Sequence, residues 1–203
     1  MTTISIIGSG NMATAIGTRA AKHGHTIELM SRNTTKAQAL ADKIGNGTSV
    51  GTYGAAPAGD IVIVAVLYDG VVDAVSSYGA ALAGKILVDI SNPFNADASG
   101  LVTPSPAAQE IAAVAPGSAH VVKAFNTIFG HVLAKGTPLD AFIAGDSAEA
   151  KATLGAFLDS LELRPLDAGG LQAAPLLEQA ALLLMGLARN GAGFELALGA
   201  DVR

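Results

Sequence analysis

A glycine-rich turn lies close to the amino terminus of this 203-residue chain and has the spacing of an anion-binding turn. The stretch Gly8-Ser9-Gly10-Asn11-Met12-Ala13 fits the pattern G-x-G-x-x-A between an expected strand and an expected helix. In such a turn Gly8 permits the tight bend, Gly10 lets the backbone approach a pyrophosphate, and Ala13 lets helix and strand pack closely. The helix N-terminus then offers unpaired N–H groups to the anion. The pattern predicts a dinucleotide site, and the alternative is a glycine-rich turn that binds nothing.

The tip of the second expected strand carries no carboxylate, although an acidic residue there would bind the ribose 2′-hydroxyl of NAD. The tip is Ser31-Arg32-Asn33, with Lys36 one turn into the next helix, and Glu28 lies too early in the strand to serve. A hydroxyl, a guanidinium and an ammonium group would bind a 2′-phosphate, which a carboxylate would repel. The tip therefore favours NADP over NAD. The alternative is that Arg32 and Lys36 are solvated surface cations and that Ser31 caps a helix.

Three later loops follow expected strands and should meet at the same edge of a parallel sheet. They are Val66-Leu67-Tyr68, Ser91-Asn92-Pro93-Phe94 and Phe125-Asn126-Thr127-Ile128. We expect them to line the nicotinamide end of the pocket, with apolar walls for the ring and a few amide or hydroxyl groups for its carboxamide. Ordinary turn and helix-cap chemistry is the alternative for each single residue.

The remaining polar residues suggest no catalytic group. His23 and His25 flank Gly24 at a helix end and are interpreted as cap partners, whereas His120 is interpreted as structural and His131 as a residue that could face the pocket. The acidic residues are scattered, and we identify no Ser-His-Asp set, carboxylate pair or His-x-x-x-His spacing. The sequence therefore predicts neither a metal site nor a covalent intermediate.

Composition narrows the class of protein. Half of the residues are apolar, 14% are charged and the net charge is −5, which lacks the basic surplus that nucleic-acid binding requires. The absence of cysteine excludes disulfides and thiolate chemistry. The apolar start is broken by glycines and has no cationic leader, and the apolar segment 176–188 is interrupted by Glu178, so we expect neither a signal peptide nor a membrane span. A cytoplasmic protein is the expectation.

Short apolar segments alternate with helix-period segments along the chain. The expected strands are 4–8, 26–30, 48–53, 60–66, 85–91, 119–127, 140–144 and 164–166, and the expected helices are 14–23, 34–44, 70–82, 106–114, 147–161 and 174–189. This order predicts a doubly wound, mostly parallel Rossmann-type α/β sheet. We expect an NADP-binding domain over 1–130 and, over 131–203, a smaller α/β extension for substrate binding and dimerisation that ends in a hydrophobic helix.

That last helix has two interpretations. Its apolar residues fall at helical spacing on what reads as one broad face: Leu176, Leu177, Ala180, Leu183, Leu184 and Leu187. The face could pack in the core, or it could form a dimer seam that also closes a second pocket, and one apolar surface can serve both purposes.

Several motifs in combination resemble one family. They are GSGNM, SR with a cation four residues beyond the Arg, VVKAFNTI, and LRPLDAGGLQAAPLLEQ leading into RNGAGFELALG. Over residues 3–199 the chain resembles the NADPH-dependent coenzyme F-420 reductases, which are 8-hydroxy-5-deazaflavin:NADP oxidoreductases. The tail is the more specific part, because many dehydrogenases share the N-terminal turn.

The resemblance implies direct hydride exchange between the nicotinamide C-4 and a deazaflavin ring stacked on it, with no obligatory acid or base. It also implies that Ser9, Ser31, Arg32 and Lys36 hold the 2′-phosphate end and that Gly10, Asn11 and Met12 hold the pyrophosphate. By the same likeness the deazaflavin lies between the strand-six loop, with Asn126, Thr127 and Ile128, and the C-terminal segment, with Leu196. Family members pair as dimers through that region.

One residue departs from the family pattern. Some members carry His where this chain has Asn126, whereas metalloreductases with a related domain have Phe-Asn there, as here. The second substrate is therefore open to alternatives, such as a flavin, a metal chelate or an imine. The opening GSGNMATAI also resembles that of pyrroline-5-carboxylate reductases, which carry a longer helical C-terminal domain. A non-catalytic NADP(H)-sensing dimer is a further alternative from a different class.

Overall fold

The computed structural model describes residues 1–103 and 105–201, and its central feature is a sheet of eight strands in the order β3-β2-β1-β4-β5-β6-β7-β8. The strands are β1 (Thr3–Ile7), β2 (Thr26–Met30), β3 (Ser49–Gly51), β4 (Ile61–Val64), β5 (Ile86–Asp89), β6 (His120–Lys123), β7 (Leu139–Gly145) and β8 (Leu163–Asp167). Neighbours pair in parallel except β6 and β7, which are antiparallel. The predicted doubly wound, mostly parallel fold is confirmed.

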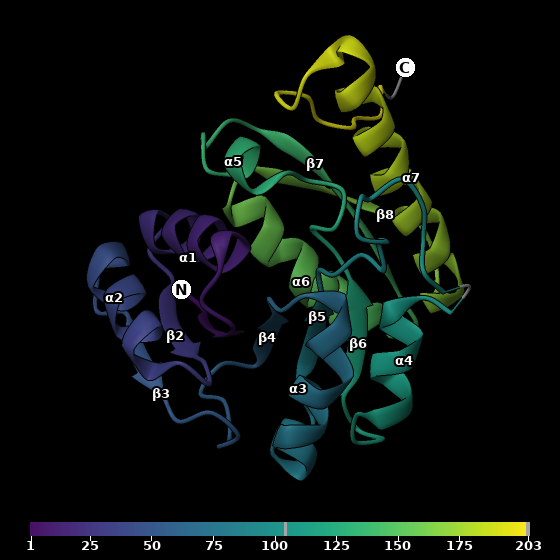
Figure 1. Cartoon of the computed structure of the whole chain (residues 1–203). Coiled ribbons are helices and arrows are strands. Elements are labelled where there is room, and N and C mark those ends of the chain that lie inside the picture. The colour runs from purple at the N-terminus through teal and green to yellow at the C-terminus, as the bar shows by residue number, and fades with distance from the viewer. Residues whose placement is uncertain (104, 202–203) are drawn as a thin grey trace.

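Helices cover both faces of this sheet (Figure 1). The α-helices are α1 (Asn11–Lys22), α2 (Thr34–Ile44), α3 (Val71–Tyr78), α4 (Ala107–Val114), α5 (Gly130–Leu133), α6 (Ala148–Ser160) and α7 (Ala174–Leu187). Short helical turns are η1 (Tyr68–Gly70), η2 (Gly79–Leu82), η3 (Leu171–Ala173) and the π-helical turn η4 (Ala188–Ala192). Because the strand order reverses between β1 and β4, a ligand crevice is expected at the carboxyl ends of these two strands.

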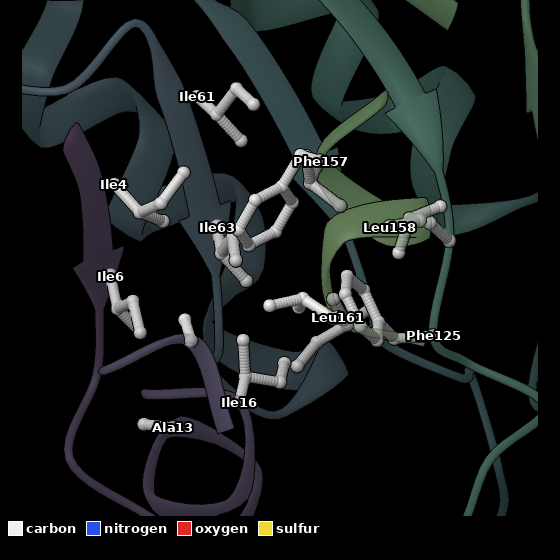
Figure 2. Packing of buried hydrophobic residues seen from close by; sticks show 14 of the residues in the cluster. Ile4, Ile6, Ala13, Ile16, Ile61, Ile63, Phe125, Phe157, Leu158 and Leu161 are labelled. Atoms are coloured by element: carbon white, nitrogen blue, oxygen red, sulfur yellow. The ribbon is translucent and has the colours of Figure 1, made fainter. Parts of the chain in front are cut away.

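Alternate residues of the central strands point to opposite faces. Ile61 and Ile63 pack against α1 and α6, whereas Val62 and Val64 pack against α3 and α4. Figure 2 shows the buried residues on the face covered by α1 and α6, where Ile63 faces Phe157 of α6. Burial on both faces explains why the central strands read as continuous apolar runs.

Several expected elements differ from the structure. The fourth and fifth strands are shorter than expected, at Ile61–Val64 and Ile86–Asp89. The single helix expected over 70–82 is divided into α3 and η2, because α3 ends at Tyr78 and its C-cap Gly79 has a φ of 46°. The third strand ends at Gly51. The sixth ends at Lys123, and two residues later Phe125 has a φ of 59°, a left-handed conformation that a strand cannot continue through.

The predicted apolar residues of the last helix do fall on one broad arc of α7, and the fold divides that arc into a buried part and an exposed part. Leu177 and Leu184 are buried against the sheet, whereas Leu176, Leu183 and Leu187 are 62%, 56% and 46% exposed. The two sets lie about 100° apart around the helix axis, since neighbouring helical residues differ by that angle. The exposed set forms an apolar stripe along the outer side of α7.

The helical run that contains α7 is longer than expected. The run Leu171–Ala192, made of η3, α7 and η4, has 22 residues and is apolar enough to cross a membrane by length and composition, with 44% of its apolar stretch buried inside the fold. Asn190 and Gly191 in η4 have non-helical backbone angles. The expectation of no membrane span stays a prediction. A mostly buried core helix passes the same test, and α7 carries the buried Glu178.

The C-terminal segment returns to the sheet after η4. The backbone N–H of Ala200 donates to Asp140 Oδ2 at 2.7 Å, and Phe194 O lies 2.7 Å from His131 Nε2. The sheet continues from β6 to β7 across residue 130, so both expected parts share one sheet. The assignment of separate roles to 1–130 and 131–203 stays a prediction.

Candidate functional site

The glycine turn joins β1 to α1 in a geometry that requires its first glycine. Gly8 has a φ of 130°, and a Cβ atom there would lie 2.2 Å from Ala65 O. Gly10 is the N-cap residue of α1, and a Cβ atom at Gly10 would meet nothing within 4 Å. Ala13 is fully buried, and the first turn of α1 has no acidic residue. The helix N-terminus therefore faces open space beside a turn in which only glycine fits at position 8.

The tip of β2 brings hydroxyls and cations beside this turn. Ser31 Oγ lies 3.2 Å from Ser9 Oγ, which joins two of the predicted 2′-phosphate residues. Asn33 caps α2 by accepting from the Lys36 backbone N–H at 2.9 Å, so the capping role considered for Ser31 belongs to Asn33. Arg32 is exposed at the same tip.

The two cations at the tip of β2 have no acidic partner among the described residues. Within the described part of the chain, the side chains of Arg32 and Lys36 take part in no ion pair. Glu28 points into the sheet edge, where its Oε2 accepts from Ser5 Oγ at 2.6 Å and from the Ala58 backbone N–H at 2.9 Å. The only nearby carboxylate of the strand is thus engaged elsewhere, and an anion at the tip would meet positive charge.

A pocket of about 390 Å³ continues from the glycine turn along the strand ends. It is lined by Gly10, Asn11, Met12, Ala65, Val66, Leu67, Tyr68, Ile90, Ser91, Asn92 and Phe94. Val66, Leu67 and Asn92 therefore lie where the nicotinamide end was expected. Pro93 is buried outside this lining, and the adjacent Phe94 faces the pocket instead.

A second pocket of about 240 Å³ adjoins the first. It is lined by Met12, Ile90, Asn92, Phe94, Phe125, Asn126, Thr127, Ile128, Phe129, Gly130, Ala181, Leu184 and Met185. Four residues, Met12, Ile90, Asn92 and Phe94, line both pockets. The predicted second-substrate residues Asn126, Thr127 and Ile128 are brought together here, between the loop after β6 and α7.

Leu196 is not brought to this pocket. It is half-buried in the C-terminal segment, and the residues that follow it, 197–199, line a different cavity of about 540 Å³ beside β7 and β8. His131 also lies outside the second pocket. It stacks on Phe129, with ring centroids 5.7 Å apart, and lines a neighbouring groove of about 430 Å³ between α1 and α5.

Two buried polar atoms in the second pocket have no partner among the described residues: Asn126 Oδ1 and Thr127 Oγ1. The Asn126 amide nitrogen, by contrast, donates to Asn92 Oδ1 at 3.0 Å and to Leu177 O at 2.9 Å. Asn92 Nδ2 in turn donates to Asn126 O at 2.9 Å. Leaving a buried polar atom unpaired costs about 1–3 kcal/mol, and these two atoms are unsatisfied among the described residues.

A buried ion cluster behind the pocket was missed by the sequence analysis, which expected no carboxylate pair. Asp89 and Glu178 both contact Lys123 Nζ, at 2.7 and 2.8 Å, and all three side chains are buried. Burial raises the pKa of Glu178 above its ordinary value, because Lys123 is shared with Asp89 and compensates only partly. A lysine inside VVKAF and a glutamate inside LLEQAALL are the signals that could have revealed it, since a buried charge needs a partner.

The described residues contain no group of three or more His, Asp or Glu side chains that could hold a metal ion. The site therefore consists of a glycine turn with an adjacent cationic tip, a first pocket along the strand ends, and a second pocket that shares a wall with the first. Such an arrangement suits two flat ligands held next to each other.

Comparisons with known proteins agree with this architecture. Residues 3–93 match the family model described as NADP oxidoreductase, coenzyme F420-dependent. The chain is 32% identical over 186 residues to the metalloreductase STEAP3 of Rattus norvegicus, covering 90% of this chain and 37% of the relative. The chain thus spans little more than a third of that relative's length.

Solved structures share the fold. A candidate F420-dependent NADP reductase from Arthrobacter sp. FB24 superimposes with a TM-score of 0.82 at 23% identity, covering 94% of this chain and 95% of that one. The hypothetical protein SMa0349 of Sinorhizobium meliloti gives a TM-score of 0.76 at 28% identity, with 86% and 89% covered. An imine reductase from Aspergillus terreus, in complex with NADPH4 and dibenz[c,e]azepine, gives 0.73 at 22% identity, with 96% and 64% covered.

At these identities the Arthrobacter and Aspergillus structures establish the Rossmann-like architecture. Residues 3–93 match the domain that the family model describes, and the described chain shares its fold with NADP-dependent reductases.

Proposed function

We propose that this protein transfers a hydride directly between NADP(H) and a deazaflavin coenzyme, 8-hydroxy-5-deazaflavin. The observation that carries the proposal is the shared wall of the two pockets, formed by Met12, Ile90, Asn92 and Phe94. Two flat rings, one in each pocket, would both contact these four residues and so lie next to each other. Hydride transfer between them needs proximity and orientation and no side-chain acid or base.

The first ligand of the proposal is NADP(H). Gly10, Asn11 and Met12 hold its pyrophosphate at the open N-terminus of α1. Ser9 and Ser31, whose hydroxyls lie 3.2 Å apart, meet the 2′-phosphate together with Arg32 and Lys36. Val66, Leu67 and Asn92 line the nicotinamide end, with Pro93 supporting the loop from beneath.

The second ligand lies against Asn126, Thr127 and Ile128. The unpaired Asn126 Oδ1 accepts from an N–H of the ring's imide edge, and the Thr127 hydroxyl donates to a neighbouring carbonyl. Ala181, Leu184 and Met185 of α7 supply an apolar wall. In the balanced reaction, NADPH gives two electrons and one hydrogen as hydride to the deazaflavin, and solvent supplies the proton that completes its reduced form.

The proposed protein is a cytoplasmic homodimer with small-molecule partners and without nucleic-acid or membrane partners. The exposed apolar stripe of α7, with Leu176, Leu183 and Leu187, supports the dimer, since a surface of this kind is usually covered. Leu196 lies outside the second pocket of its own protomer. In the proposal it therefore contacts the second substrate only if the dimer brings it to the pocket of the partner protomer.

The test mixes purified protein with NADPH and 8-hydroxy-5-deazaflavin and follows the loss of the deazaflavin's visible absorbance. The expected result is stoichiometric bleaching, with NADPH preferred over NADH. Calorimetry of NADPH binding is the control for a folded and competent site. Absence of bleaching at every pH, with NADPH binding intact, would refute the deazaflavin as acceptor.

A second acceptor class is supported by one residue and one relative. Asn126 follows Phe125 as in metalloreductases, and the relative with 32% identity is named a metalloreductase. Parallel assays with a flavin, a ferric chelate and a cyclic imine separate these acceptors. Turnover with one of them and none with the deazaflavin would favour that class, and binding of NADPH without any turnover would favour a sensing role.

A further inference from the structure

Lys123 lies at the carboxyl end of β6, and its ammonium group is fully enclosed by protein. Its Nζ donates to Asp89 Oδ2 at 2.7 Å, to Ser91 O at 2.6 Å and to Glu178 Oε1 at 2.8 Å. An ammonium group has three donors, so every one is used. Asp89 and Glu178 come from β5 and α7, and the cluster therefore joins two strand ends to one helix.

The two carboxylates also hold backbone. Asp89 Oδ1 accepts from the Ser91 backbone N–H at 2.9 Å and from Ser91 Oγ at 2.7 Å. Glu178 Oε1 accepts from the backbone N–H of Ala107, the first residue of α4, at 3.0 Å. Removing three charges from water is expensive, and such clusters seldom add net stability. The arrangement therefore calls for an explanation other than stability alone.

A layer of uncharged contacts connects the cluster to the second pocket. Asn92 follows Ser91, and Asn126 lies three residues after Lys123. The Asn126 side-chain amide donates to Asn92 Oδ1, and Asn92 Nδ2 donates to the backbone carbonyl of Asn126. Asn126 Nδ2 also donates to Leu177 O, next to Glu178 in α7. The loop after β5, the loop after β6 and α7 are therefore joined twice, once by Lys123 and once by the hydrogen bonds of Asn92 and Asn126. Asn92 and Asn126 line the second pocket.

We propose that the buried cluster of Lys123, Asp89 and Glu178 is a positioning device that sets the separation between the loop after β5, the loop after β6 and α7, and so the spacing of the two ligands. This inference rests on the proposed two-ligand function. Lys123 itself lines neither pocket; it contacts Ser91, which lines the first pocket, and acts through Ser91, Asn92 and Asn126. The NADP phosphates lie at the other end of the first pocket, beyond the reach of this device.

Hydride transfer depends steeply on the distance and alignment of the two rings, and a misplacement of about 1 Å can lower a rate on the order of a hundredfold. Loosening the cluster should therefore lower kcat and leave NADPH affinity nearly unchanged. A cluster that only stabilises the fold would lower the melting temperature without this separation.

We choose Glu178 as the residue to substitute. Lys123→Met would leave two buried carboxylates unpaired, and that variant could fail to fold. Glu178→Ala removes the acceptor that bonds Lys123 and Ala107, whereas Glu178→Gln keeps an acceptor oxygen at the same place. We expect Glu178→Ala to lower kcat with NADPH and 8-hydroxy-5-deazaflavin about tenfold or more, with the NADPH Kd within about twofold. Glu178→Gln should restore most of the rate.

Glu28→Ala is the matched control. Glu28 likewise accepts from a backbone N–H and from a second side chain, Ala58 and Ser5, and lines neither pocket. We expect it to lower the melting temperature while kcat stays near the wild-type value. If Glu178→Ala and Glu28→Ala behave alike, or if Glu178→Gln is as slow as Glu178→Ala, the positioning role is overturned.

Hydrogen–deuterium exchange separates this inference from the proposed function. Glu178→Ala should speed exchange of the amides in 91–95 and 126–130 and leave 8–13 as in the wild type, whereas Glu178→Gln should protect all three segments. This readout requires no turnover, so it decides the inference even if the wild-type protein fails to reduce the deazaflavin. Uniform acceleration over all three segments would indicate a general loss of stability and contradict the positioning role.

Discussion

The two ends of the candidate site are built in different ways. The phosphate end is formed by residues close together in the sequence, from Gly8 to Ala13, with the nearby tip Ser31 to Lys36. The acceptor end is formed by Asn92, Asn126 and Leu184, which come from three distant segments. A local backbone geometry governs the first end, and contacts between distant elements govern the second. Substitutions should therefore act at the phosphate end through the turn itself and at the acceptor end through long-range packing.

The largest expected effect comes from Gly8→Ala, which tests whether the phosphate end depends on backbone geometry alone. The new Cβ would lie 2.2 Å from Ala65 O at a φ of 130°. We expect a loss of about 3 kcal/mol or more in the free energy of unfolding, measured by urea denaturation. Gly10→Ala is the control, because its Cβ meets nothing within 4 Å. It should unfold like the wild type and bind NADPH more weakly, and equal destabilisation by both changes would refute this view of the turn.

The next effect concerns the charge at the phosphate end. The double variant Arg32→Ala, Lys36→Ala should weaken NADPH at least about tenfold, since charge-assisted contacts are each worth roughly 1.5–3 kcal/mol, and NADH much less. Calorimetry with both nucleotides gives the comparison. Lys22→Ala, an exposed cation in the last turn of α1, should change neither affinity. Equal losses for NADPH and NADH in the double variant would show that the tip does not recognise the 2′-phosphate.

Thr127→Val tests the acceptor end with a substitution that nearly preserves the shape of the side chain. The buried Thr127 Oγ1 has no partner in the described residues, so replacing it with a methyl group should raise the free energy of unfolding by up to about 1 kcal/mol. The KM for the acceptor should rise about threefold to tenfold, because the hydroxyl is then lost to the ligand, while the NADPH Kd stays the same. A lower stability together with an unchanged KM would mean that the hydroxyl serves the fold and not the ligand.

The smallest effect lies outside both ends, where Arg164 holds Asp140 beside the C-terminal segment. Hydrogen bonds from Arg164 lower the pKa of Asp140 below its ordinary value of 3.8. A lowered folded pKa means that this stabilisation is present above the ordinary value and is lost as pH falls through the folded one. Asp140→Asn should therefore flatten the acid limb of stability, measured by thermal unfolding between about pH 2 and pH 6, and leave NADPH affinity at neutral pH unchanged. An unaltered acid limb would contradict the assignment.

Sequence patterns predicted the parts of this molecule that depend on local periodicity. The strands around Ile4, Ile27 and Ile63 and the cap at Asn33 follow from alternation, length and capping chemistry. The division of the apolar arc of α7 into a buried and an exposed part did not follow, because Leu176 and Leu177 are equally apolar and only the position of the sheet decides which is buried. The division of the helix expected over 70–82 depends on the conformation at Gly79, which composition alone does not reveal.

The sequence by itself determined that a dinucleotide turn exists, that the adjacent tip carries cations without an acid, and that strands and helices alternate. These features depend on neighbours within a few residues, so the order of residue types is sufficient to reveal them. Only the tertiary structure decided that Asp89 and Glu178 share Lys123, that Asn126 and Thr127 line a pocket and carry buried atoms unpaired among the described residues, and that this pocket has a wall in common with the first. Burial and pairing of polar groups are properties of residues far apart in the chain, and they become visible when β5, β6 and α7 are brought together.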